Sequence, residues 1–214
     1  MRLVLPKLYV ILDAGLITTQ KNDCALKLAD AAVRFLLYRN KSASSRQLLE
    51  TSREMAGLLL PRGVMFFVND RPDVAALAGA SGVHLGQEDL GVEQARSVVG
   101  QRMLIGVSTH NVEQLKAAVT TSADYIAVGP VFSTSTKGNP DPVVGVDFIR
   151  VVRPLTDKPI VVIGGITLDR AAGLIEAGAD SVAVISDILR APDPAQRARQ
   201  YVNLLGAANN AAAV

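Results

Sequence analysis

Short runs of apolar, often β-branched residues recur along the chain, and within each run they are continuous instead of alternating with polar residues. This pattern is typical of parallel strands that are covered on both faces. We expect eight such strands, at 8–12, 35–38, 64–68, 82–85, 104–108, 125–129, 160–164 and 182–186.

The segments between these runs carry helix periodicity and helix punctuation. Ser44 with Gln47 predicts a capping box, as does Asn111 with Gln114. Pro72 suits the first turn of a helix. Gly178 lies where the end of a helix favours a residue in the left-handed conformation. Strict alternation of strand and helix predicts an α/β fold, a closed (β/α)8 TIM barrel in a single domain over 1–206, with 207–214 as a disordered tail. An open doubly wound sheet is the alternative.

Three of the expected helix-to-strand joints resemble one another. They read GASGV from Gly79, SADYI from Ser122 and GADSV from Gly178, and each leads into the next strand. The similarity indicates a weak internal repeat.

Composition narrows the possible partners. Hydrophobic residues make up 49% of the chain and charged residues 20%, as in a folded globular protein, and the net charge is only +2. No basic cluster alternates with aromatic residues, which argues against nucleic-acid and membrane partners. No run approaches ~18 apolar residues, and no cleavage pattern follows the N-terminus, so we expect a cytoplasmic location. Cys24, the single cysteine, is expected to be a packing residue.

Polar or glycine-rich residues follow each expected strand, as where MFFV gives way to Asn69 and Asp70. In a barrel the C-terminal ends of the strands form one rim, where such folds place their active sites. Asp70 and Asp89 follow neighbouring strands, and one or two carboxylates with substrate phosphate oxygens typically hold Mg2+. The alternative is that Asp70 caps the helix starting at Pro72 and that Asp89 is a plain loop residue.

Three cations are expected on the same rim, Arg39, Lys41 and Lys137, where they would neutralise a departing diphosphate. Solvated surface cations are the alternative. Gly164 and Gly165 precede a helix, and with Ile185 and Ser186 they match the phosphate site formed by the last two loops of such barrels.

The long segment FSTSTKGNP offers hydroxyls and a lysine that suit a phosphorylated ligand. The alternative is a flexible, solvated loop, which would have the same composition. No Ser-His-Asp or Cys-His pairing is evident, and two histidines make a zinc site improbable. His84 is expected to be a hydrogen-bonded core residue, and His110 is a candidate proton shuttle.

Seven motifs in this order, YRNK, VNDRPDVA, GVHLGQEDL, IGVSTH, DYIAVGPVFSTSTK, VVIGGIT and VAVISDI, resemble the thiamin phosphate synthase family over nearly the whole chain. That family couples 4-amino-5-hydroxymethyl-2-methylpyrimidine diphosphate to 4-methyl-5-(2-hydroxyethyl)thiazole phosphate by a dissociative route. The resemblance implies that the chain is an enzyme, a transferase of thiamine biosynthesis.

The resemblance also implies a role for each candidate residue. Asp70 and Asp89 would hold Mg2+. The pyrimidine diphosphate would be surrounded by Arg39, Lys41, Asn69, Ser108 and Lys137, of which Arg39, Ser108 and Lys137 would be catalytic. The thiazole phosphate would be held by Thr134, Thr136, Gly165, Ile185 and Ser186.

One position departs from the family pattern, which usually reads Gln-x-Arg-x-Lys on the second strand. Leu37 stands at the Gln position and offers the pyrimidine no hydrogen bond. Two alternatives therefore stay open. One is a thiazole tautomerase of the related TenI-like group, and the other is a non-catalytic protein that binds the thiazole phosphate.

Overall fold

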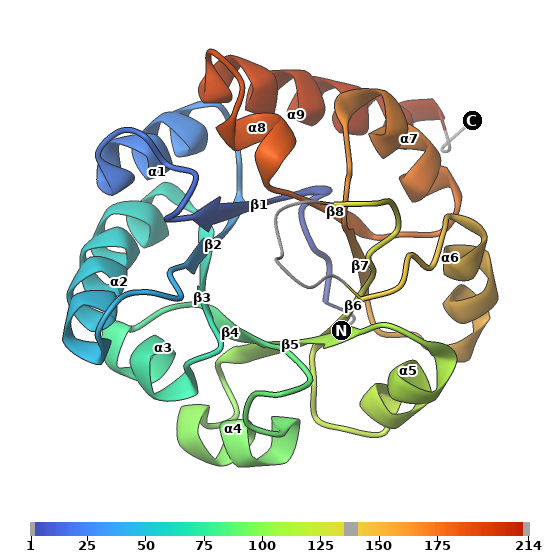
Figure 1. The fold of residues 1–214 in the computed structure, drawn as a ribbon, viewed down its shortest axis with the longest axis horizontal. Coiled ribbons are helices and arrows are strands. Elements are labelled where there is room, and N and C mark those ends of the chain that lie inside the picture. The colour runs from blue at the N-terminus through green and yellow to red at the C-terminus, as the bar shows by residue number, and fades with distance from the viewer. Residues whose placement is uncertain (1–2, 135–140, 212–214) are drawn as a thin grey trace.

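The computed structural model describes residues 3–134 and 141–211. Eight parallel strands close into a barrel in chain order, because each strand pairs with the next and β8 pairs back with β1. Helices surround the barrel on the outside (Figure 1). This confirms the expected (β/α)8 TIM barrel and excludes the open sheet, which has no pairing between its first and last strands.

The described strands are β1 Leu8–Asp13, β2 Phe35–Arg39, β3 Met65–Asn69, β4 Gly82–Leu85, β5 Leu104–Thr109, β6 Tyr125–Val128, β7 Ile160–Ile163 and β8 Ser181–Val184. The described helices are α1 Lys21–Asp30, α2 Ser45–Leu59, α3 Pro72–Ala78, α4 Val92–Val99, α5 Val112–Val119, α6 Asp147–Val152, α7 Leu168–Glu176, α8 Ser186–Leu189 and α9 Pro194–Ala211, with short 3-10 turns at Leu60–Arg62 and Arg153–Leu155.

Four aromatic rings fill the barrel near the beginnings of its strands: Tyr9, Phe35, Phe67 and Tyr125. The Tyr9 and Phe35 rings stack with their centroids 3.6 Å apart, and Phe67 and Tyr125 meet edge to face at 5.9 Å. Bare glycines on the neighbouring strands make room, since a Cβ at position 106 would lie 2.0 Å from the Tyr125 ring. This aromatic plug supports the floor of any cavity above it.

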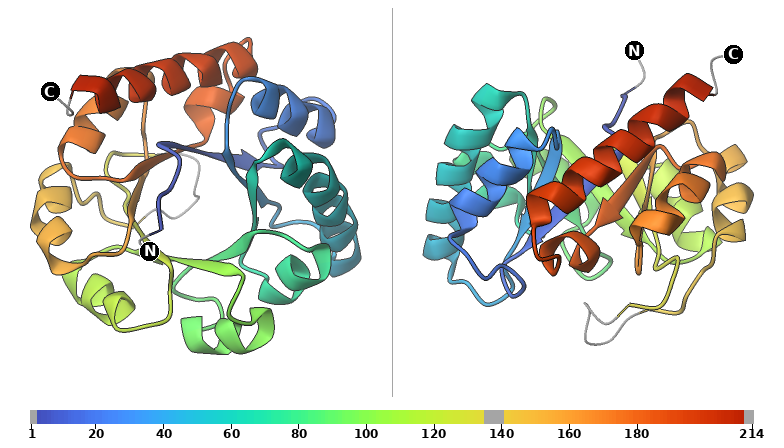
Figure 2. Two further views of the ribbon diagram at one scale, coloured as in Figure 1. Left: turned by 180° about the vertical axis from the view of Figure 1, so that it is seen from behind. Right: turned by 90° about the horizontal axis from the view of Figure 1, so that it is seen from above.

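The outer core lies between the barrel and the helices. It takes the alternate strand residues that point outward, such as Val10, Leu36 and Phe66. Helix α9 packs against α1, α7 and α8 and so joins the first and last parts of the barrel (Figure 2). It is described as far as Ala211, and the expected disordered tail over 207–214 stays a prediction. Among the described residues no helix is both long and apolar enough to cross a bilayer.

The helix starts follow the predicted punctuation with one difference. Ser44 and Gln47 form the reciprocal capping box, and Pro72 opens α3. Asn111 caps α5 by accepting from the Gln114 N–H, but the Gln114 side chain accepts from the N–H of His110 and not from that of Asn111. The second capping box is therefore incomplete.

The three similar joints share one hydrogen-bond pattern. Ser81, Asp124 and Asp180 each donate a backbone N–H to the carbonyl of a residue in a preceding strand, at Phe66, Ile105 and Ile160 respectively. The side chain of each then accepts the N–H of that same residue. The weak sequence repeat thus corresponds to a two-point clamp that ties β4, β6 and β8 to the strands before them.

Asp124 offers the clearest test of this clamp because it also accepts from the buried Arg96 guanidinium at 2.7 Å. In Asp124→Ala the Arg96 charge would lose its ion pair and the Ile105 N–H its acceptor. We expect the free energy of unfolding to fall by about 2 kcal/mol, measured by urea denaturation. Asp147→Ala, which removes the exposed Asp147–Arg150 pair, is the control and should change little. Equal effects of the two substitutions would contradict the clamp.

Candidate active site

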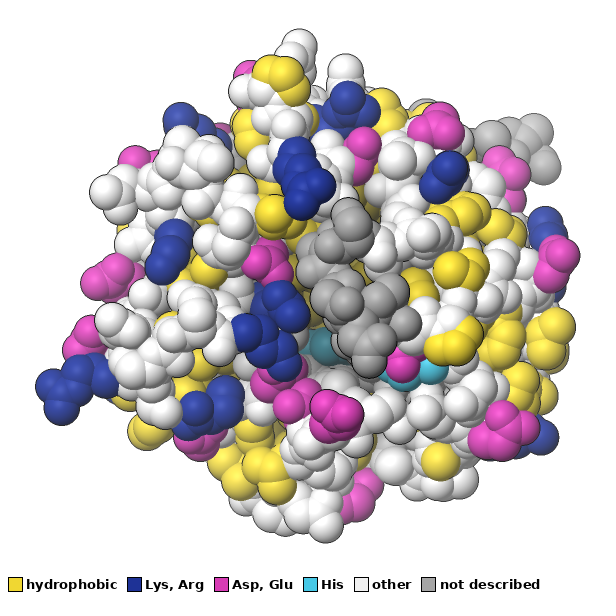
Figure 3. Space-filling model, in the orientation of Figure 1, with side chains coloured by type: hydrophobic (Ala, Val, Ile, Leu, Met, Phe, Trp, Pro, Cys, Tyr) yellow, Lys and Arg dark blue, Asp and Glu magenta, His cyan; other side chains and the backbone are white. Residues whose placement is uncertain are grey.

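A cavity of about 510 Å³ opens at the rim formed by the C-terminal ends of the strands. This volume is in the range of small-molecule sites. Acidic and basic side chains gather on one side of the opening, and histidine lies at its base (Figure 3). The cavity brings together these predicted site residues: Arg39, Lys41, Asn69, Asp70, Asp89, Ser108, Thr134, Gly165, Ile185 and Ser186. Thr136 and Lys137 lie outside the described residues.

The end of β3 turns sharply at Asp70, whose backbone adopts φ 63°. Such a conformation is uncommon outside glycine but tolerated by aspartate. The Asp70 N–H donates to the carbonyl of His84 at 2.8 Å, which holds the turn against β4. Helix α3 begins after Arg71 without a side-chain cap. Asp70 is therefore not a helix cap, and its carboxylate lines the cavity.

Asp70 and Asp89 are neighbours in the cavity wall. Burial raises the pKa of Asp89, and a hydrogen bond and the charge of Asp70 raise this pKa further. Asp89 also accepts the Gly86 N–H at 2.7 Å, which fixes its carboxylate, and Asp70 forms an ion pair with Lys41. A partly buried carboxylate next to a second carboxylate, with its pKa raised in part by that neighbour, fits a divalent cation. The described residues contain no group of three potential ligands, so further oxygens would have to come from substrate and water.

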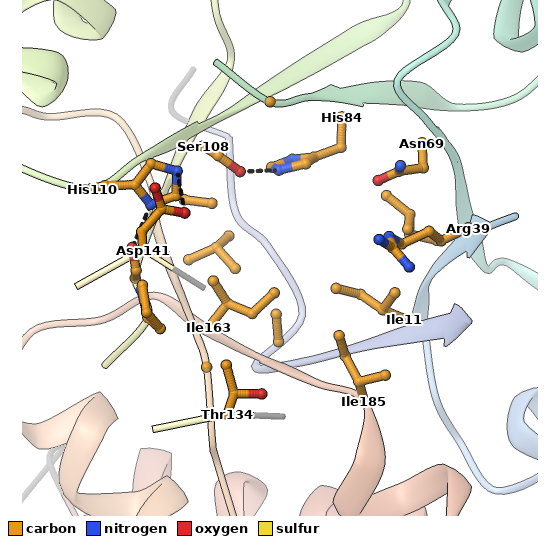
Figure 4. Close-up of a pocket in the computed structure, with 18 of the residues that line it drawn as sticks. Ile11, Arg39, Asn69, His84, Ser108, His110, Thr134, Asp141, Ile163 and Ile185 are labelled. Carbon is orange, nitrogen blue, oxygen red and sulfur yellow. Dashed lines mark hydrogen bonds and ion pairs between the residues drawn. The ribbon is translucent and has the colours of Figure 1, made fainter. Parts of the chain in front are cut away.

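Arg39 ends β2 and extends into the cavity (Figure 4). Its guanidinium pairs with Asp13, a buried residue at the end of β1. Asp13 is held in turn by the Gly15 N–H at 2.9 Å. Asp13 directly follows the expected strand 8–12, but the sequence pattern did not indicate its role as the residue that orients Arg39. Its position beside Arg39 in the pairing of β1 with β2 could have revealed it.

A hydrogen-bonded chain runs from the cavity into the aromatic plug. The Ser108 hydroxyl lies 2.9 Å from Nε2 of His84, Nδ1 of His84 lies 2.9 Å from the Tyr125 hydroxyl, and that hydroxyl lies 3.3 Å from the hydroxyl of Tyr9. Burial lowers the pKa of His84 to about 4, and the charge of Asp89 opposes this shift only in part. His84 is hydrogen-bonded as expected, but it also lines the cavity, which the sequence pattern did not indicate.

His110 lies across the cavity from Arg39 (Figure 4). Its Nδ1 donates to the carbonyl of Gly129 at 2.6 Å, and its Nε2 lies 3.5 Å from a carboxylate oxygen of Asp141. The ring is thus held between the loops after β5 and β6. Its role as a proton shuttle stays a prediction.

The loops after β6 and β7 pack closely at the predicted phosphate end. Gly164 and Gly165 adopt φ 104° and 60°. A Cβ on Gly165 would lie 2.3 Å from the carbonyl oxygen of Ser133. The Phe132 N–H donates to the Gly164 carbonyl, which ties the two loops together. Ile185 and Ser186 lie at the start of α8, which follows β8. The two glycines and these two residues therefore line the same cavity, as expected.

The remaining wall is apolar. Leu37 is 1% exposed and packs in the same inner cluster as Ile11, Val161 and Ala183, and all four line the cavity. Leu37 thus faces the ligand space at the position where the family pattern has Gln.

Comparison with known proteins agrees with this geometry. The family model described as thiamine monophosphate synthase matches residues 8–188. The chain belongs to this family. Two relatives named thiamine-phosphate synthase are similar over nearly their whole length. The one from Koribacter versatilis is 49% identical over 95% of this chain and 97% of its own. The one from Chloroflexus aurantiacus is 42% identical over 91% and 90%.

A solved structure places the family resemblance in three dimensions. It is the thiamine phosphate pyrophosphorylase from Pyrococcus furiosus, which superposes with a TM-score of 0.86 at 29% identity. The match covers 95% of this chain and 96% of that one. The family fold therefore extends over nearly the whole chain.

The lowered pKa of His84 can be tested by NMR titration of its ring. The folded state binds this proton less tightly than the unfolded state, whose histidine titrates near 6.5. His84 should therefore stay neutral as the pH falls from 8 to 5 and titrate only near pH 4. Between pH 6.5 and 4 the unfolded chain carries the additional proton, so this group makes stability fall with falling pH. Titration of His84 near pH 6.5 would show that its burial is incomplete.

Proposed function

We propose that the chain joins 4-amino-5-hydroxymethyl-2-methylpyrimidine diphosphate to 4-methyl-5-(2-hydroxyethyl)thiazole phosphate, forming thiamin phosphate and diphosphate. This is the transferase activity for which the reported relatives are named. One observation carries the proposal: a single cavity has two differently built ends. Paired carboxylates and cations line one end, and the glycine loop and the start of α8 line the other, as two phosphorylated substrates require.

The end with the charged residues suits the diphosphate. Arg39 presents a planar guanidinium and Lys41 an ammonium group, and both would bind phosphate oxygens. Asn69 and Ser108 supply neutral polar groups at the same wall. Lys137, which lies outside the described residues, would add a further cation, as the family resemblance implies.

Asp70 and Asp89 would hold Mg2+ at this end. When bound, the ion neutralises the oxygens of the diphosphate and stabilises the charge that develops as it leaves. Asp70 now pairs with Lys41. With Asp70 engaged by a cation, Lys41 can turn to the diphosphate.

The opposite end suits a monophosphate. Gly165, Ile185 and Ser186 would bind it through backbone N–H groups and a hydroxyl, and Thr134 lines the same cavity. Thr136, which lies outside the described residues, would add a second threonine hydroxyl, as the family resemblance implies. Gly165 cannot be replaced without displacing the Ser133 carbonyl, so the backbone itself shapes this end.

The reaction needs charge stabilisation more than a nucleophilic side chain. The C–O bond to the diphosphate breaks with its electron pair staying on the leaving oxygen, and the lone pair of the thiazole nitrogen forms the new C–N bond. Arg39, Lys41 and Ser108 would stabilise the departing charge. The apolar wall around Ile11 and Leu37 would exclude water, which would otherwise capture the pyrimidine-methyl cation. The cytoplasmic location and the absence of nucleic-acid partners stay predictions.

The metal assignment is tested by replacing one carboxylate. In Asp70→Asn we expect kcat to fall at least ~10-fold, since metal charge stabilisation contributes several kcal/mol. Product is measured as the oxidised fluorescent derivative of thiamin phosphate over a range of Mg2+ concentrations. Asp73→Asn is the matched control, because Asp73 is exposed, pairs with Arg71 and lies outside the cavity.

Two outcomes would overturn parts of the proposal. Wild-type turnover of Asp70→Asn at saturating Mg2+ would remove Asp70 from the metal site. No product from the wild-type chain, with thiazole phosphate still bound, would move the assignment to a tautomerase or a binding protein.

A further inference from the structure

The hydrogen bonds that link Ser108, His84, Tyr125 and Tyr9 form a relay. The donor and the acceptor in each of these bonds can be assigned, because each hydroxyl carries a single proton. Tyr9 is 1% exposed. Among the described residues, the hydrogen-bond partner of its hydroxyl is the Tyr125 hydroxyl. A buried hydroxyl proton without an acceptor is costly. Tyr9 therefore donates to Tyr125.

This assignment fixes the donors and acceptors in the rest of the relay. The Tyr125 oxygen accepts from Tyr9, so its own proton goes to Nδ1 of His84 at 2.9 Å. A neutral imidazole with Nδ1 as acceptor carries its proton on Nε2. That N–H donates to the Ser108 oxygen, also at 2.9 Å. The proton of Ser108 is thus left to point into the cavity.

We propose that Tyr125, acting through His84, fixes Ser108 as a hydrogen-bond donor to the substrate. The inference rests on the proposed synthase function and deepens it. The group that Ser108 meets must be an acceptor, either a pyrimidine ring nitrogen or an oxygen of the diphosphate. Tyr125 and His84 are positioning residues here, and Ser108 is the group that touches substrate.

Packing holds the relay in this geometry. The Tyr125 ring occupies the space left by Gly106, where a Cβ would lie 2.3 Å from the hydroxyl oxygen. On its other side the ring stacks on His84 with centroids 5.6 Å apart. The ring of Tyr125 therefore cannot move away without disturbing the plug.

The first test reads the tautomer of His84 directly. The chain has two histidines, so 15N-histidine labelling gives a simple spectrum, which His110→Gln assigns. In the wild-type protein at pH 7 we expect His84 to be protonated on Nε2. In Tyr125→Phe, which keeps the ring, the form protonated on Nδ1 should become populated. A wild-type His84 protonated on Nδ1 would overturn the proposal, and so would a tautomer unchanged in Tyr125→Phe.

The second test is a double-mutant cycle on kcat/KM. Ser108→Ala and Tyr125→Phe should each lower kcat/KM by up to about 100- to 1,000-fold, the range for loss of one preorganised donor. The double variant should be no worse than Ser108→Ala, because both substitutions remove the same donor. Multiplicative losses would mean that Tyr125 acts only through packing. Tyr38→Phe is the control, since it removes a buried hydroxyl outside the cavity and should keep wild-type kcat/KM.

Binding measurements separate the two possible acceptors. If Ser108 donates to the diphosphate, Ser108→Ala should weaken binding of inorganic diphosphate measured with Mg2+. If it donates to the ring, the same variant should weaken binding of the unphosphorylated pyrimidine alcohol. Unchanged binding of both would overturn the proposal. If the wild-type protein has no synthase activity, only the proposed function is overturned, because the His84 tautomer is measured without turnover.

Discussion

The pairing of β8 with β1 is the constraint on which the rest of this protein depends. Once the parallel sheet is closed, every strand ends at the same rim, and residues as distant in sequence as Arg39 and Ser186 must line one cavity. Closure also creates an interior that has to be filled. The aromatic plug fills it near the strand beginnings, and the remaining space near the strand ends becomes the site.

The charged wall is built from groups that satisfy one another when no ligand is bound. Arg39 pairs with Asp13, and Lys41 pairs with Asp70. The unfavourable feature that remains is Asp89, whose pKa is raised first by burial and then by its hydrogen bond with Asp70 and by the charge of Asp70. A carboxylate in a cleft whose pKa is perturbed by burial and by a charged neighbour is a candidate functional group. The wall therefore suits a cation and an anion together.

The barrel and most of the candidate site could be predicted from the sequence because both depend on local signals. Continuous apolar runs identify buried parallel strands, and the polar residue after each run lies at the rim. The relay from Ser108 to Tyr9 could not be predicted in this way. Its hydrogen bonds join residues on β5, β4, β6 and β1. They also depend on Gly106, because a Cβ at this position would collide with the Tyr125 ring from β6. His84 looked like a core histidine because its partners are distant in sequence.

The ion pairs of the charged wall also bear on product release. A site with two unpaired cations would hold the diphosphate product tightly, and release limits the rate of many enzymes. Here Asp13 would compete with the diphosphate for Arg39, and Lys41 would regain Asp70 once Mg2+ and the diphosphate have left. As the diphosphate leaves, each cation would regain a carboxylate that is already in place. These pairings would favour release of the product, so that the site can empty and start another cycle.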